Sequence, residues 1–221
     1  MENESVLIDA DVYQYMNEVS LRPNSDLEAL VNAAERFTTN PHLSIALDQA
    51  QLLQFVLRLI GAKEVLEIGM YAGISALAMA QALPTDGRLT TVELNPQHQE
   101  MAEKYWQLAG VKHKIDLQIG FAEPILQSWL DAGRTECFDF IFLDADKRSY
   151  DVYYEQSLQL LRAGGLLAID NVLWIGRMVH TNDGTPAIKA LQALNKKLLT
   201  DSRIDLVTLP VGSGVSFIRK I

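Results

Sequence analysis

Acidic side chains follow two apolar runs in this 221-residue sequence, FIFL and LLAI. Asp144 comes directly after the first run, and Asp170, with Asn171 behind it, comes after the second. Neighbouring parallel strands lie about 4.8 Å apart, so residues that end them at one edge can reach the same ion. Two carboxylates and an amide oxygen suit Mg²⁺ or Ca²⁺ better than zinc. The alternative is that Asp144 is a helix N-cap and Asp170 opens a turn.

Lys147 lies three residues after Asp144 and could overhang the same edge. Beside a divalent cation in a desolvated cleft, a lysine loses its proton more easily and can act as a base. Otherwise it is a solvated surface cation.

Aromatic residues that could wall a pocket for a flat substrate follow both runs: Tyr150, Tyr153, Tyr154 and Trp174. For Tyr153 and Tyr154 a core position is favoured.

The segment VLEIGMYAGISALAMA is typical of a strand, a tight turn and a helix start. An open α/β sheet binds ligands at such a turn, and Gly69 and Gly73 would let the backbone approach a bound molecule. The spacing is not G-x-G-x-x-G, which disfavours a pyrophosphate cradle. Two glycines can also mark nothing more than a turn.

Glu93 ends the next apolar run, at about the offset from the glycine turn where an acidic residue meets ribose hydroxyls. The alternative is a solvated glutamate at a strand end. After the third run, Ala122 could flank an adenine, whereas Glu123 could be only an acidic residue in a first helical turn.

From about Lys63 onward, short apolar runs alternate with amphipathic segments, which predicts parallel strands joined by crossover helices. The predicted strands are 64–69, 88–94, 115–120, 138–144 and 165–170, and the predicted helices are 74–83, 95–110, 122–133 and 149–165. Three of these four helical segments end in glycine, as helix C-terminal caps do.

Only VGS separates the last two predicted strands, 204–210 and 214–220, so they should form an antiparallel hairpin at the edge of a seven-stranded sheet. Before Lys63, the segments 26–39 and 48–62 read as helices, with Asp26 and Asp48 as N-caps. We therefore expect one α/β domain over 1–221, in which N-terminal helices within 1–62 pack on a core of 63–221.

Composition excludes several classes of function. The net charge of −9 disfavours a nucleic-acid partner, which requires clustered basic residues. No run of about 18 apolar residues predicts a membrane span. Cys137 is the only cysteine, so an intramolecular disulfide is impossible, and a cytoplasmic protein is expected.

Five stretches together resemble the cation-dependent O-methyltransferases that use S-adenosylmethionine, the group containing caffeoyl-CoA and catechol O-methyltransferases. They are VLEIGMYAGISALAMA, TVELNP, FDFIFLDADKRSY, GGLLAIDNVLWIGRM and LPVGSGVSFIRK, and the likeness spans about Leu43 to Ile221. It implies a Rossmann-like class I methyltransferase fold with helices on both faces of the sheet.

The resemblance also implies roles for single residues. Around the methionine part of the cofactor would lie Glu67, Gly69, Tyr71 and Ser75, with Glu93 at the ribose, Ala122 at the adenine and Asp146 near the amino group. Further cofactor-binding residues would be Leu43, Gly73 and Asp144. Asp144, Asp170 and Asn171 match the metal ligands, with Mg²⁺ ahead of Ca²⁺ or Mn²⁺. Lys147 matches the proposed base, acting with Asp144, and Tyr153 and Trp174 fall where relatives contact the substrate.

The implied reaction is methylation of one hydroxyl of a catechol-like or caffeoyl-type vicinal diol, in a homodimer. Ser213 replaces the aspartate of a PVGDG motif common in relatives, and Ile175 replaces a polar residue, so both departures bear on substrate identity. Two other classes stay open at this point. They are an NAD(P)-dependent oxidoreductase and a non-catalytic nucleotide-binding module.

Overall fold

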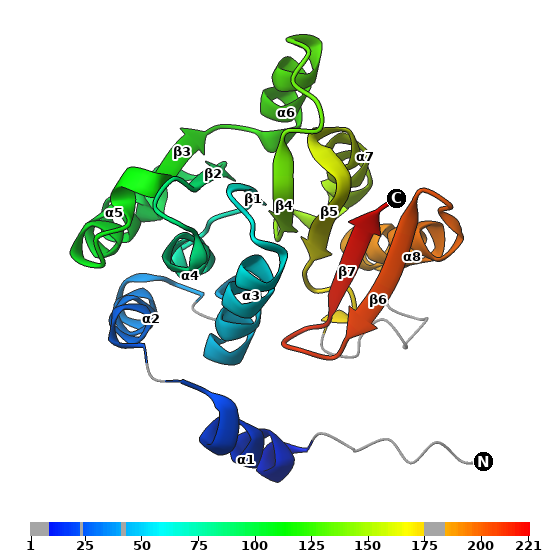
Figure 1. Ribbon diagram of the computed structural model, residues 1–221. Helices are drawn as coiled ribbons and strands as arrows, with labels where there is room; N and C mark the ends of the chain where they lie inside the picture. The colour runs from blue at the N-terminus through cyan, green and yellow to red at the C-terminus, as the bar shows by residue number, and fades with distance from the viewer. Residues whose placement is uncertain (1–8, 23, 41–42, 175–183) are drawn as a thin grey trace.

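The protein folds around one seven-stranded sheet, seen in a computed structural model that describes residues 9–22, 24–40, 43–174 and 184–221 (Figure 1). The strands are β1 Glu64–Ile68, β2 Arg88–Glu93, β3 Ile115–Ile119, β4 Phe138–Leu143, β5 Leu161–Ile169, β6 Ile204–Leu209 and β7 Val215–Lys220. Their order is β3-β2-β1-β4-β5-β7-β6. The first five strands pair in parallel, and β7 pairs antiparallel with both β5 and β6. The predicted fold class is confirmed.

Eight α-helices accompany the sheet in the described part of the chain. They are α1 Ala10–Ser20, α2 Ser25–Phe37, α3 Leu47–Ile60, α4 Ile74–Ala82, α5 Gln99–Leu108, α6 Ala122–Asp131, α7 Tyr150–Leu160 and α8 Pro186–Thr200. None of the helices in these ranges is long and apolar enough to span a membrane. Ile175 lies outside the described residues.

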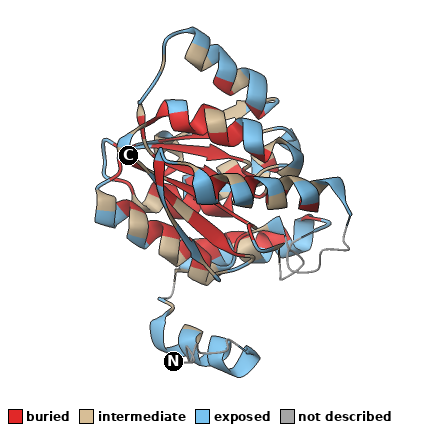
Figure 2. Ribbon diagram, turned by 90° about the vertical axis from the view of Figure 1, so that its right-hand side faces the viewer, coloured by how far each residue is buried: buried red, intermediate tan, exposed pale blue. Residues whose placement is uncertain are grey.

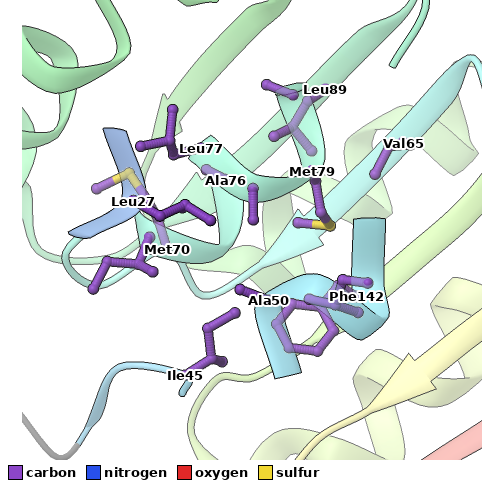
Figure 3. Close-up of a cluster of buried hydrophobic side chains, with 14 of the residues drawn as sticks. Leu27, Ile45, Ala50, Val65, Met70, Ala76, Leu77, Met79, Leu89 and Phe142 are labelled. Carbon is purple, nitrogen blue, oxygen red and sulfur yellow. The ribbon is translucent and has the colours of Figure 1, made fainter. Parts of the chain in front are cut away.

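Strand side chains alternate between two apolar clusters, one on each face of the sheet. Figure 2 shows the strands of the sheet as mostly buried. Val65 packs with α2 to α5, in the cluster of Figure 3, whereas Leu66 packs with α6 to α8. Phe140 and Ile141 in β4 alternate in the same way. The central strands are therefore buried on both sides, as parallel sheets require.

The N-terminal helices differ in how they pack. Helices α2 and α3 lie against α4 and α5 on one face of the sheet. Helix α1, which the sequence analysis did not identify, has no buried residue and lies apart from the sheet in Figures 1 and 2. Gln51 of α3 links to the end of α1 by accepting a hydrogen bond from the Arg22 amide and donating one to the Ser20 carbonyl.

Two predictions about the N-terminal helix caps are wrong. The side chain of Asn24, not Asp26, caps α2 by accepting a hydrogen bond from the Leu27 amide, and Asp26 binds Gln81 instead. Helix α3 begins after Ala46 without a side-chain cap, and Asp48 lies in its first turn. Each helix therefore begins one residue before the aspartate that was predicted to cap it.

The helix predicted over 149–165 is too long at its C-terminal end. Helix α7 ends at Leu160, and β5 begins at once with Leu161, which pairs with Phe138 of β4. Gly164 and Gly165, expected to end the helix, lie inside β5 next to an irregularity in the β4–β5 pairing. Burial of Leu160 and Leu161 against the sheet overrides the helical pattern.

The two glycines of the turn after β1 make room for protein atoms. A Cβ on Gly69, where φ is +96°, would lie 2.1 Å from the Asp144 carbonyl oxygen. A Cβ on Gly73, where φ is +80°, would lie 2.7 Å from the Cβ of Ala102 in α5. The missing Cβ atoms therefore have a packing role, because they bring β1 close to β4 and α4 close to α5. The expectation that they also let a ligand approach the backbone stays a prediction.

We expect Gly69→Ala to lower the free energy of unfolding by more than about 3 kcal/mol, because it adds a backbone clash to an unfavourable φ. Gly133→Ala is the matched control, since φ there is +79° but a Cβ would meet nothing within 4 Å. That change should cost only about 1–2 kcal/mol. Urea unfolding measures both, and equal losses would contradict the packing role of Gly69.

Candidate active site at the carboxyl edge of the sheet

Main-chain hydrogen bonds align the ends of the five parallel strands. The amide that follows β3, β1, β4 or β5 donates to a carbonyl at the end of a neighbouring strand: Gly120 to Glu93, Gly69 to Val92, Asp144 to Ile68 and Asp170 to Leu143, all at 2.9–3.0 Å. The residues after β1, β4 and β5 consequently lie at one edge of the sheet.

Asp144 and Asp170 lie together at this edge. Asp170 is 2% exposed, and burial together with the Asp144 carboxylate raises its pKa to about 7. The backbone amide of Asn171 donates to Asp170 Oδ1 at 2.7 Å. Asn171 itself has a positive φ of +62°. Across the described residues, no three histidine, cysteine, aspartate or glutamate side chains form a metal-binding group, so any cation here would need the Asn171 oxygen or a substrate as a further ligand.

Lys147 contacts both the acidic edge and a buried tyrosine. Its Nζ donates to Asp144 Oδ1 at 2.8 Å and to the Tyr150 hydroxyl at 2.6 Å. Tyr150 is fully buried, its hydroxyl lies 3.4 Å from the Asp170 carbonyl oxygen, and burial followed by the Asp144 charge raises its pKa. Tyr150, which the sequence analysis considered only as a possible wall of a substrate pocket, is part of the site through its bond to Lys147. The three-residue spacing from Lys147 was the signal for it.

Asp146 and Tyr153 bind each other. The exposed Asp146 carboxylate accepts from the Ser149 amide through Oδ1, and from the Tyr153 hydroxyl through Oδ2 at 2.9 Å. Tyr153 is 6% exposed, and burial together with Asp146 raises its pKa to about 12. Its hydroxyl therefore orients Asp146 in this structure. Trp174, at φ +40°, is half-buried and packs against the α6–α8 side of the core.

Glu93 binds the backbone of the glycine turn. Its Oε2 accepts from the amides of Met70 and Tyr71 at 3.0 and 2.8 Å, and its Oε1 accepts from Asn95. The sequence analysis did not predict this contact. A carboxylate has about four acceptor positions, so these three bonds leave about one position for a ribose hydroxyl.

A small pocket lies between the glycine turn and the segment before α3. It is lined by Leu43, Ser44, Ile45, Gly69, Met70, Tyr71, Ala72, Ile74, Ser75 and Asp144. Among these are five of the residues predicted to bind a cofactor: Leu43, Gly69, Tyr71, Ser75 and Asp144. The lining does not include Gly73, which faces α5, or Ala122, which begins α6.

Glu67 is fully buried at the end of β1. The Thr91 hydroxyl donates to its Oε2 at 2.5 Å, while Oε1 has no hydrogen-bond partner among the described residues. Burial raises the pKa of Glu67 to about 8, against the opposing effect of the Ser75 and Thr91 hydroxyls. The side chain is therefore largely neutral at pH 7.

The O-methyltransferase family matches this chain over residues 6–221. The chain belongs to that family. A caffeoyl-CoA O-methyltransferase of Petroselinum crispum is 38% identical over 99% of this chain and 94% of its own length. A probable caffeoyl-CoA O-methyltransferase 2 of Dictyostelium discoideum is 40% identical over 79% of this chain and 76% of its own.

Solved structures agree with this O-methyltransferase assignment. The O-methyltransferase TomG of Streptomyces achromogenes, solved in complex with SAM, is similar with a TM-score of 0.85 and 28% identity, over 95% of this chain and 96% of that one. The chain is thus an enzyme of this family, and neither the oxidoreductase nor the non-catalytic alternative is supported.

We expect Glu67 to make stability depend on pH. Its pKa is about 8 in the folded state and 4.5 in the unfolded state. Its stabilising contribution to the free energy of unfolding is therefore fully present below pH 4.5 and is lost as pH rises through 8. Between pH 5 and 8, wild-type protein should lose about 3 kcal/mol more unfolding free energy than Glu67→Gln. Urea unfolding at several pH values tests this, with Glu64→Gln, at the exposed end of β1, as control. Parallel curves for wild type and Glu67→Gln would contradict it.

Proposed function

We propose that this O-methyltransferase is divalent-cation-dependent and transfers the methyl group of S-adenosylmethionine to one hydroxyl of a catechol-like or caffeoyl-type vicinal diphenol. The observation that carries the proposal is the meeting of Asp144, Asp170 and Lys147 at one edge of the sheet, beside the pocket of the glycine turn. Two further facts support it: relatives are named caffeoyl-CoA O-methyltransferases, and a structural neighbour was solved with SAM.

Asp144, Asp170 and Asn171 would hold the cation. The donor set fits, because burial and the neighbouring Asp144 carboxylate raise the pKa of Asp170, and a bound cation would offset both effects. Oxygen ligands favour Mg²⁺, with Ca²⁺ or Mn²⁺ as alternatives. When bound, a divalent cation lowers the pKa of a hydroxyl that it coordinates and fixes the position of that oxygen.

Lys147 would accept the proton of the reacting hydroxyl. Its Nζ lies at the acidic edge between Asp144 and Tyr150, and the side chain is only 14% exposed, so little solvent competes for it. The phenolic oxygen then attacks the methyl carbon in line, the carbon–sulfur bond breaks, and its electron pair passes to sulfur. The chain's main contribution is to place the donor and acceptor.

The methyl donor would lie along the edge from β1 to β3. Leu43, Glu67, Gly69, Tyr71, Gly73 and Ser75 would surround its methionine part, with Glu93 at the ribose, Ala122 at the adenine and Asp146 near the amino group. Trp174 is proposed to contact the substrate. For Tyr153, the bond to Asp146 supports a role in orienting that carboxylate more directly than a substrate contact.

Methyl transfer to a vicinal diphenol, measured by mass spectrometry of the product, tests the function. Chelator should lower wild-type turnover by at least about 100-fold, with recovery on adding Mg²⁺. Asp170→Asn should lose a similar factor while its affinity for S-adenosylhomocysteine stays within about 3-fold, because Asp170 does not line the cofactor pocket. Asp116→Asn, at an exposed position of β3, is the control. Wild-type turnover that persists in chelator would contradict the proposal.

We further propose a cytoplasmic homodimer formed through the N-terminal helices. Tyr15 and Val19 of α1 and Phe55 and Leu59 of α3 are 63–71% exposed, and large exposed apolar side chains mark contact surfaces. Light scattering coupled to gel filtration should give twice the chain mass, and Val19→Glu with Leu59→Glu should give the monomer. A monomeric wild type at micromolar concentration would overturn this.

A further inference from the structure

A buried hydrogen bond joins Thr91 to Glu67 in the centre of the sheet. The two residues are direct partners in the β1–β2 pairing, and both side chains are fully buried. The Thr91 hydroxyl donates to Glu67 Oε2 at 2.5 Å, which is short for a hydroxyl donor. In an interior without competing water, such a bond holds the carboxyl group in one orientation.

The other carboxyl oxygen of Glu67, Oε1, is left available for a further hydrogen bond. Oε1 is buried and has no hydrogen-bond partner in the described part of the chain. The Ser75 hydroxyl interacts with the Glu67 carboxyl group and lowers its pKa, and Ser75 also lines the pocket of the glycine turn. A buried polar atom without a partner is costly, so its retention indicates that a ligand group completes its bonding.

We propose that Thr91 is a positioning residue for the methyl-donor site, holding Glu67 so that Oε1 serves the amino-acid end of S-adenosylmethionine. The inference rests on the proposed function and adds a residue that touches neither donor nor acceptor. A bound ammonium group of the ligand would favour the ionised form of Glu67 and would donate to Oε1. Thr91 acts only through Glu67, since its hydroxyl is fully buried beneath that side chain.

A purely structural role for Thr91 makes a different prediction. Thr91→Val keeps the shape of the side chain and removes the hydroxyl, whereas Thr91→Ser keeps the hydroxyl and removes a methyl group. If Thr91 only stabilises the sheet, both variants lower the melting temperature and neither changes ligand affinity. If it positions Glu67, affinity follows the hydroxyl, and serine rescues it.

Calorimetric titration of the full chain with S-adenosylhomocysteine separates these cases. Thr91→Val should raise the dissociation constant by about 10-fold, and Thr91→Ser by less than about 3-fold. The KM for S-adenosylmethionine should rise with it, while kcat changes less. Thr90→Val is the matched control, because Thr90 directly precedes Thr91 in β2 and its side chain points to the other face.

A double variant tests whether the effect passes through Glu67. In the Glu67→Gln background, Thr91→Val should change the dissociation constant by less than about 2-fold, because coupled residues are not additive. This comparison, together with Thr91→Ser, keeps the test decisive if Thr91→Val alone folds poorly. Equal affinity of wild type and Thr91→Val, equal losses in the valine and serine variants, or additive effects would overturn the inference alone. A wild type that does not bind S-adenosylhomocysteine would overturn the proposed function as well.

Discussion

The main-chain hydrogen bonds between strand ends are the constraint on which the rest of the site depends. They join the amides after β3, β1, β4 and β5 to carbonyls at the ends of neighbouring strands. Because side chains alternate along a strand, a slip of one residue would exchange Asp144 with Leu143 and turn the carboxylate toward the other face. Gly69 lets β1 approach the Asp144 backbone closely enough for this alignment. The chemistry of the edge is thus a product of sheet register.

The acidic groups at this edge outnumber the basic ones, because two carboxyl groups, Asp144 and Asp170, lie near one ammonium, Lys147. Asp170 is buried beside Asp144, and burial together with the Asp144 carboxylate raises the pKa of Asp170. The ammonium of Lys147 is bound between Asp144 and Tyr150, so one positive charge already balances part of this charge. A cation bound here would replace Lys147 as the positive charge beside Asp144. Metal binding would thus free Lys147 to act as the proposed base.

Much of the fold was predictable from the sequence, because apolar runs and glycine positions report strands and turns directly. The end of α7 was not, since Leu160 and Leu161 fit a helix until their pairing with β4 is known. The roles of Glu93 and Thr91 also depend on which strands are neighbours, and a strand order with β1 between β2 and β4 is not a local property. The convergence of Asp144 and Asp170 was predicted only on the condition that their strands adjoin.

The central claim is that Asp144, Asp170 and Asn171 form one cation site with Lys147 beside it. A crystal structure with Mn²⁺ and S-adenosylhomocysteine, with anomalous scattering used to locate the metal, tests it most directly. The account predicts one Mn²⁺ bound to oxygens of all three residues, with Lys147 Nζ no longer bonded to Asp144. Mn²⁺ bound elsewhere, or an Asp144–Lys147 ion pair that persists at saturating Mn²⁺ without metal between the aspartates, would contradict it.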